Sequence, residues 1–221
     1  MDFKAGEIFA IDKPYRISSF GALAHVRYVL SRTLGYKVKI GHAGTLDPLA
    51  TGVLILCTGK ATKRIEEFQG QTKEYTATLQ LGATTASYDM EHEVNASFPT
   101  EHITRELIND TLPQFIGDIE QIPPTYSAVK VNGDRAYELR RAGEEVKLKP
   151  KHIHIDEIEV VDFDVEKMQL SLRVVCGKGT YIRALARDLG RALNSGAYLT
   201  ALRRTRVGDF TIDRCLDYEH I

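Results

Sequence analysis

The chain has few cysteines, no long apolar run and no apolar segment at its start. Its 221 residues include three cysteines, Cys57, Cys176 and Cys215, which are an odd number with wide spacing. That argues against a disulfide framework or a zinc site, and for a reducing compartment. No stretch approaches the roughly 20 apolar residues that a membrane span needs. The first fifteen residues contain acids and no hydrophobic region, so we expect a cytoplasmic protein without a secretory signal.

An excess of charge of one sign is also missing, because 29 basic and 30 acidic residues leave a net charge of −1. The charges are unevenly distributed, however. Residues 1–64 carry +6, residues 65–125 carry −9 and residues 126–221 carry +2. Within the last block, residues 173–206 hold eight basic residues and one acid. Two basic stretches of this kind can form a positively charged face for nucleic acid, or they can simply be solvated surface.

The hydrophobic pattern predicts an α+β fold around a mixed, mostly antiparallel central sheet flanked by helices. Residues 73–81 alternate apolar and polar side chains as a half-buried strand does, and 152–163 and 168–176 read as two more strands. Residues 20–30 and 182–193 have apolar residues at helical spacing. In the first of these helices the expected apolar face is Phe20, Leu23, Val26 and Leu30. Neighbouring strands without an intervening helix favour antiparallel pairing.

The segment GHAGTLDPLATG, residues 41–52, combines glycines, a proline and one acid, Asp47. Such a loop can hold unusual backbone angles and approach a ligand closely. Asp47 is the only acid between Asp12 and Glu66, and a carboxylate in a positive field stays ionised, as a nucleophile requires. The alternative is an ordinary aspartate that caps the turn before Pro48.

This segment resembles motif II of the TruB family of tRNA pseudouridine synthases. Six further segments resemble family motifs in the same order: IDKPYRISSF (11–20), LCTGKATK (56–63), KEYTATLQLGATTASYD (73–89), QIPPTYSAVKVNGDRAYELRRAGEEV (121–146), CGKGTYIRALARDLG (176–190) and LRRTRVGDF (202–210). The resemblance covers residues 7 to 210. It implies the pseudouridine synthase fold and isomerisation of uridine 55 in the T arm of tRNA, with no cofactor and no metal.

The chain departs from the family pattern in three places. Arg16 stands where glycine is usual, so the turn there is expected to differ, and His92 replaces another glycine. Family members commonly continue into a C-terminal RNA-binding module, often a PUA domain, whereas this sequence ends at Ile221, eleven residues after Phe210. We therefore expect one catalytic domain over residues 1–221, a short form without that module, acting as a monomer.

The resemblance also implies roles for individual residues. Asp47 is the catalytic carboxylate, which either attacks C1′ or deprotonates C2′ of the sugar. Tyr75 stacks on the flipped base and is a candidate for transfer of the C5 proton, and Arg183 pairs with Asp47. The implied substrate-binding residues are His42 near the target base, Tyr75, Tyr181 and Leu202 in the uracil pocket, Lys13 as a support of the site, and Lys63 as a phosphate contact.

Two other interpretations stay open from the residues alone. The first is a pseudouridine synthase for another RNA, and the second is a non-catalytic RNA-binding or RNA-folding protein on the same scaffold. An aspartate-dependent hydrolase or phosphatase would want a second carboxylate near Asp47, and the sequence supplies none nearby.

Overall fold

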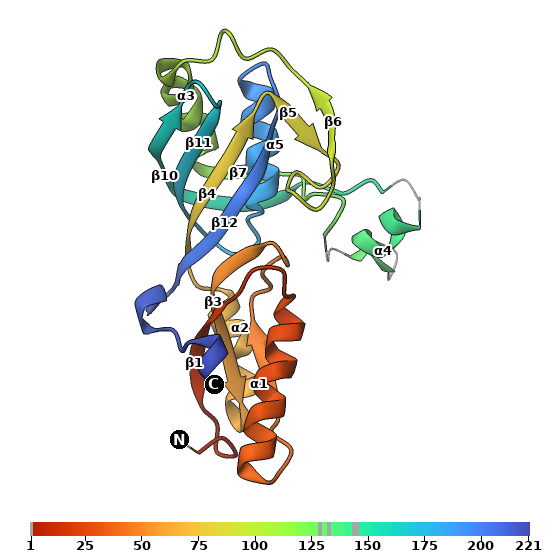
Figure 1. Cartoon of the computed structure of the whole chain (residues 1–221), viewed down its shortest axis with the longest axis vertical. Coiled ribbons are helices and arrows are strands. Elements are labelled where there is room, and N and C mark those ends of the chain that lie inside the picture. The colour runs from red at the N-terminus through yellow and green to blue at the C-terminus, as the bar shows by residue number, and fades with distance from the viewer. Residues whose placement is uncertain (1, 128–129, 132–133, 143–145) are drawn as a thin grey trace. The chain divides into compact units, whose positions relative to one another are not determined.

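The computed structural model describes residues 2–127, 130–131, 134–142 and 146–221 (Figure 1). The chain divides into two compact units. The first unit contains Met1–Thr76 and Leu202–Ile221, and the second contains Ala77–Ala201. The first unit therefore joins the two ends of the sequence, and it carries the segment with Asp47.

The centre of the first unit is strand β3 (Ala50–Thr58). Strand β1 (Ile8–Lys13) pairs with it antiparallel, with Lys13 opposite Gly52. Strand β2 (Ile40–Ala43) is also antiparallel to β3, and strand β12 (Ala197–Val207) runs parallel to it from Leu202, which faces Ala50. Strand β13 (Phe210–Thr211) pairs with the end of β12. The unbroken apolar run of residues 53–57 suits a strand that is buried on both faces.

Helix α1 (Ser19–Leu34) covers one face of β1 and β3 (Figure 1). The Ser18 hydroxyl accepts a hydrogen bond from the Gly21 N–H at its start, and Gly35, at φ 72°, ends it. Leu23 and Val26 pack there against Leu54. The opposite face is covered by Phe68 of α2 (Ile65–Gln69), which follows a short 3-10 helix, η1 (Gly59–Arg64).

In the second unit the strand order is β4-β11-β10-β7. Strand β10 is antiparallel to both β11 and β7. The bounds are β4 (Lys73–Leu81, beginning in the first unit), β7 (Gly117–Gln121), β10 (Lys151–Asp164) and β11 (Gln169–Cys176). The helices are α3 (Arg105–Thr111), η2 (Leu112–Phe115) and α5 (Ile182–Ala192). Leu185 and Leu189 on the buried side of α5 are at most 1% exposed.

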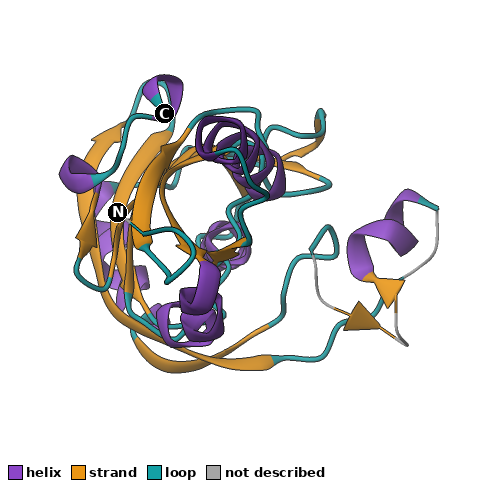
Figure 2. Ribbon diagram, turned by 90° about the horizontal axis from the view of Figure 1, so that it is seen from below, coloured by secondary structure: helices purple, strands orange, loops and turns teal. Residues whose placement is uncertain are grey.

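Several short elements complete the described chain. Strands β5 (Ala83–Thr85) and β6 (Val94–Ser97) form one two-stranded sheet. Strands β8 (Lys130–Val131) and β9 (Asp134–Arg135) form another, beside α4 (Ala136–Arg141), as Figure 2 shows. Two 3-10 turns, η3 (Ile212–Arg214) and η4 (Tyr218–His220), lie near the C-terminus. None of the helices in the described part of the chain combines the length and apolar character of a membrane span.

The α+β class and the mixed, mostly antiparallel sheet are confirmed. Two details of the prediction were wrong, and one strand was missed. Phe20 is 66% exposed, because α1 turns Ser19 inward instead. The glycine-rich loop is shorter than residues 41–52, since β2 ends at Ala43 and β3 begins at Ala50. Strand β12 was not predicted.

Candidate active site

The loop that carries Asp47 is a six-residue connection, residues 44–49, between β2 and β3. Gly44 has φ 85°, in the left-handed region that glycine tolerates best. The Ala50 N–H donates to the Asp47 carbonyl at 3.0 Å, which closes a turn at the start of β3. Asp47 itself is half-buried. Its backbone is therefore held by the first residue of the central strand of the unit.

A buried lysine at the end of β1 binds the backbone of this loop. Lys13, at the end of β1, has no exposed surface. Its Nζ donates to the carbonyl oxygens of Ile17 at 2.6 Å, Pro14 at 2.8 Å and Pro48 at 3.4 Å. Burial lowers the pKa of Lys13 to about 8, the Asp47 carboxylate opposes that shift, and Arg204 adds to it. These contacts fit the predicted role of Lys13 as a support, because its ammonium group binds the backbone of Pro48, next to Asp47.

A buried arginine holds the same loop from the adjacent strand. Arg204 of β12 is 1% exposed, and it donates from Nε to the Val53 carbonyl at 2.8 Å and from Nη2 to the Gly44 carbonyl at 2.9 Å. Buried charged groups need such partners, and here the partners are the carbonyl oxygens of the first residue of the loop and of a residue in the strand that follows it. Arg204 thereby ties the loop to β12.

The close approach of β12 to β3 depends on Gly52. Gly52 has φ 106°, and a Cβ placed on it would collide with the Arg204 carbonyl oxygen. In the parallel register that this close approach allows, Leu202 lies opposite Ala50. Ala50 is three residues after Asp47 in the sequence. Leu202, the predicted wall of the uracil pocket, is half-buried there. Leu202 and Asp47 are thus neighbours in the first unit.

The first residue of α1 and the segment before it bind the other side of the loop. The Ser19 hydroxyl exchanges two hydrogen bonds with the backbone of Leu46, at 2.9 and 2.8 Å. The Arg16 N–H donates to the Pro48 carbonyl at 2.8 Å. Arg16 has φ 65°, in the left-handed region that is uncommon for residues other than glycine.

The remaining predicted residues of the first unit lie on separate elements. His42 lies on β2 rather than in a loop, and its Nδ1 is buried without a hydrogen-bond partner in the described part of the chain. Burial, and secondarily Arg204, lowers the pKa of His42. Tyr75 is 7% exposed on the inward face of β4, as the alternation predicted. Lys63 is exposed on η1.

In the second unit Tyr181 occupies the N-cap position of α5. The side-chain amide of Gln121, at the end of β7, binds the Tyr181 backbone twice. Oε1 accepts from the Tyr181 N–H at 2.9 Å, and Nε2 donates to its carbonyl at 3.2 Å. Gln121 is 2% exposed, so this pair of bonds is shielded from water. The position of Tyr181 is thus set by a side chain sixty residues earlier in the sequence.

Arg183, on the first turn of α5, is only 4% exposed. Its Nη1 donates to the Ser87 carbonyl at 3.1 Å and its Nη2 to the Tyr126 carbonyl at 2.9 Å. The Asp89 carboxylate lies 3.8 Å from its Nε and also accepts from the Ser87 hydroxyl at 2.5 Å. These contacts fix the plane of the guanidinium group before any substrate binds.

The structure thus brings Asp47, Lys13 and Leu202 together in the first unit, and Tyr181 and Arg183 together in the second. Sequence reasoning missed Arg204, Gln121 and Asp89 as residues that hold this machinery. All three lie inside segments that resemble family motifs, and that was the available signal. No set of three His, Cys, Asp or Glu side chains suited to a metal ion occurs among residues 2–127, 130–131, 134–142 and 146–221.

Comparison with known proteins places these residues in a family context. The family model for the N-terminal domain of the TruB pseudouridylate synthases matches residues 31–182, and the model for the C-terminal domain of tRNA pseudouridylate synthase B matches residues 183–221. The tRNA pseudouridine synthase B of Bacteroides thetaiotaomicron is 62% identical, over 100% of this chain and 93% of that protein. The same-named protein of Flavobacterium johnsoniae is 50% identical, over 98% and 94% respectively.

A solved structure supports the same grouping. The Cbf5-Nop10-Gar1 complex contains a chain that is 28% identical to this one, with a TM-score of 0.71. The similarity covers 97% of this chain and 53% of that one. The fold, the ordered motifs and the high identity to full-length relatives all agree, and the chain belongs to the TruB family of pseudouridylate synthases.

Proposed function

We propose that this protein is a tRNA pseudouridine synthase that isomerises uridine 55 of tRNA to pseudouridine. The observation that carries the proposal is the support of Asp47. A lone carboxylate lies on a short loop whose backbone is bound by Lys13 and Arg204, in a chain 62% identical to a tRNA pseudouridine synthase B. The enzyme is an isomerase, and we place it in the cytoplasm, where tRNA is modified.

The reaction breaks the C1′–N1 glycosidic bond of uridine, turns the detached uracil and joins C5 to C1′. The C5 proton leaves and N1 takes up a proton, so the atoms balance without an external reagent. The Asp47 carboxylate acts at the sugar, either as the nucleophile at C1′ or as the base at C2′. In both routes the loop must hold the carboxylate ionised and oriented.

The surroundings of Asp47 suit that requirement. Lys13 and Arg204 are buried cations whose charges act on the same region, as the opposite effects of Asp47 and Arg204 on the pKa of Lys13 indicate. Positive charge in a region of low dielectric stabilises a carboxylate more than it would in water. Arg183 supplies a third cation in this proposal, with its guanidinium group already oriented by Ser87 and Tyr126.

The other residues hold the uracil. Tyr75 stacks on the flipped base and takes part in moving the C5 proton, while Tyr181 and Leu202 form the walls of the pocket and His42 contacts RNA beside the target. A base inside the folded T arm must be flipped out at a cost of a few kcal/mol. Contacts of Lys and Arg with phosphates, Lys63 among them, offset that cost and make binding sensitive to salt. The enzyme acts as a monomer in this scheme.

The experiment is pseudouridine mapping over every uridine of an unmodified tRNA transcript incubated with the purified protein. The proposal predicts one new pseudouridine, at position 55, and none in a transcript with cytidine at that position. Modification at another uridine would contradict the assigned target, and an unmodified transcript at stoichiometric enzyme would contradict the reaction itself.

A further inference from the structure

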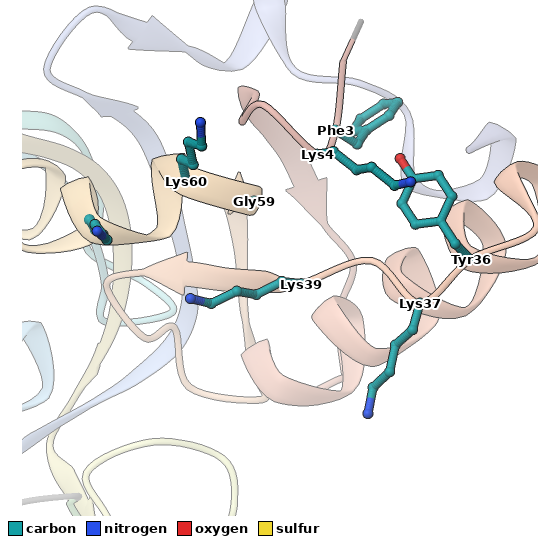
Figure 3. Close-up of a pocket in the computed structure, with 8 residues that line it drawn as sticks. Phe3, Lys4, Tyr36, Lys37, Lys39, Gly59 and Lys60 are labelled. Atoms are coloured by element: carbon teal, nitrogen blue, oxygen red, sulfur yellow. The ribbon is translucent and has the colours of Figure 1, made fainter.

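A concave surface lined with lysines lies in the first unit (Figure 3). Gly59, one of its lining residues, directly follows β3, whereas Asp47 lies before the start of that strand. The volume of the concave surface is about 350 Å³, and none of its lining residues is acidic. Five lysines line it: Lys4, Lys37, Lys39, Lys60 and Lys63. All five side chains are exposed, and none has a carboxylate oxygen within 4 Å in the described part of the chain. We call these five residues the lysine pocket.

The backbone beneath the lysine pocket is closely packed. Gly59 has φ 49°, and a Cβ on it would collide with the Lys4 carbonyl and lie 2.7 Å from the Phe3 carbonyl. The Gly59 N–H donates to the Lys39 carbonyl at 2.9 Å. Three segments, the N-terminal turn, the connection from α1 to β2, and η1, therefore meet at Gly59. The arrangement of the lysine Cα atoms is set by this packing rather than by flexible surface loops.

Aromatic side chains help to order two of these segments. The Lys4 ammonium group lies 4.3 Å from the centre of the Tyr36 ring, a cation–π contact. Phe3 packs edge-on against Phe9 of β1 at 6.3 Å between ring centres. The contacts join the N-terminal turn to the segment after α1, and they leave the cluster of positive charge facing solvent.

The directions of the lysines identify the kind of anion. Figure 3 shows the side chains of Lys37, Lys39 and Lys60 pointing away from one another instead of converging on one point. A single free phosphate is best held by donors that converge on it, whereas a nucleic-acid backbone presents phosphates in succession. Lysine is a flexible point charge, which suits phosphate contacts that do not depend on sequence.

The distance from Asp47 identifies the part of the RNA. Strand β3 begins three residues after Asp47 and ends next to Gly59, and its nine residues span about 25 Å. Helix α1, which runs from the loop contact of Ser19 toward Tyr36, has sixteen residues and spans about 24 Å. An RNA helix needs several base pairs to extend over that distance. The lysine pocket therefore faces helical RNA away from the target uridine.

We propose that the lysine pocket binds successive backbone phosphates of the RNA helix that extends from the arm carrying the target uridine. The inference rests on the proposed function and names a second contact region for the same substrate. It would let the chain hold a folded RNA at two points, one at Asp47 and one about 25 Å away. The formal charge of −1 for the whole chain is then compatible with strong local attraction.

The test compares the double variant Lys37→Gln, Lys60→Gln with a control, Lys167→Gln, Arg214→Gln, which removes two exposed charges outside the lysine pocket. Binding of full-length tRNA is measured over a range of salt concentrations. The pocket variant should bind about tenfold more weakly, and the slope of log Kd against log salt should become shallower by about 2. The control should change neither quantity appreciably. All four side chains are exposed, and matching thermal unfolding curves check that the variants fold.

Two further arms separate the possible failures. A hairpin with a stem of about four base pairs cannot reach the lysine pocket, so it should bind the pocket variant and the wild-type protein equally. The assignment would be overturned if the pocket variant lost the same affinity for the hairpin as for the tRNA, or if the control variant lost as much tRNA affinity as the pocket variant. It would also be overturned if the wild-type protein bound inorganic phosphate while the pocket variant kept its tRNA affinity. If the wild-type protein modifies tRNA and the pocket variant binds tRNA with wild-type affinity, only this inference is overturned. Wild-type protein that neither binds nor modifies tRNA overturns the proposed function as well.

Discussion

Replacing Lys13 by methionine tests whether a buried ammonium group holds the Asp47 loop. The change removes the donor to three carbonyl oxygens, of Pro14, Ile17 and Pro48. The two bonds shorter than 3 Å are each worth about 1.5–3 kcal/mol, because the donor is charged. Their loss therefore costs about 4 kcal/mol. Replacing the lysine also removes the cost of burying its charge. A pKa of about 8 in place of 10.5 means that the charged form in the folded protein costs about 3 kcal/mol at neutral pH. We expect a net loss of about 1 kcal/mol of unfolding free energy at pH 7.

The pH dependence gives the sharper result. Between pH 8 and 10.5 the folded protein holds fewer protons at Lys13 than the unfolded chain does, so this group makes stability rise with pH. The methionine variant lacks that rise. The gap in unfolding free energy between wild type and variant should consequently widen by about 2 kcal/mol from pH 7 to pH 9.5.

Urea unfolding followed by circular dichroism at both pH values measures this gap, and it suits a chain that has no tryptophan. Lys178→Met, at an exposed position, is the matched control and should show no widening. A gap that is the same at both pH values would refute the argument that Lys13 is buried and charged beneath the loop.

Three other substitutions test separate parts of the account. Gly52→Ala places a Cβ against a backbone oxygen of β12 and should lower the free energy of unfolding in urea by about 3 kcal/mol. The control Gly35→Ala, at φ 72° with no atom within 4 Å, should lower it by about 1 kcal/mol. Equal costs would contradict the close approach of β12 to β3. Gln121→Leu removes both hydrogen bonds between the Gln121 amide and the Tyr181 backbone and should cost about 2 kcal/mol, so an unchanged unfolding midpoint would argue against that pair of bonds. Tyr75→Phe should reduce single-turnover modification more than tRNA affinity, and an equal loss of both would favour a simple packing role.

Elements with a regular apolar period were predictable from the sequence. Strand β4 alternates buried and less buried side chains over residues 73–81, and α5 buries Leu185 and Leu189 as the spacing of its apolar residues indicated. Apart from Lys73, Arg183 and Arg187, the buried side chains in these two elements are apolar, so the apolar period largely reports burial directly. Asp47 could be identified for a related reason, because the whole segment around it resembles a family motif.

Elements whose burial depends on distant partners were not predictable. Strand β12 buries Arg204, and that burial is possible only because Gly44 and Val53, more than 150 residues earlier, offer their carbonyl oxygens. A charged residue in a local sequence pattern indicates a side chain exposed to solvent, so this segment was not recognised as a buried strand. Helix α1 shows the same effect. Ser19 turns inward because its hydroxyl binds the backbone of Leu46, and the rotation leaves its neighbour, Phe20, exposed.

The central claim is that the Asp47 carboxylate performs the chemistry while other residues bind the RNA. The most direct measurement is single-turnover formation of pseudouridine at position 55 by Asp47→Asn protein, at a concentration where all tRNA is bound. Asparagine keeps the size of the side chain and removes its charge. We expect no detectable product and a tRNA affinity within about threefold of wild type, since the lost group contributes to chemistry and not to binding. Turnover within about tenfold of wild type would contradict it.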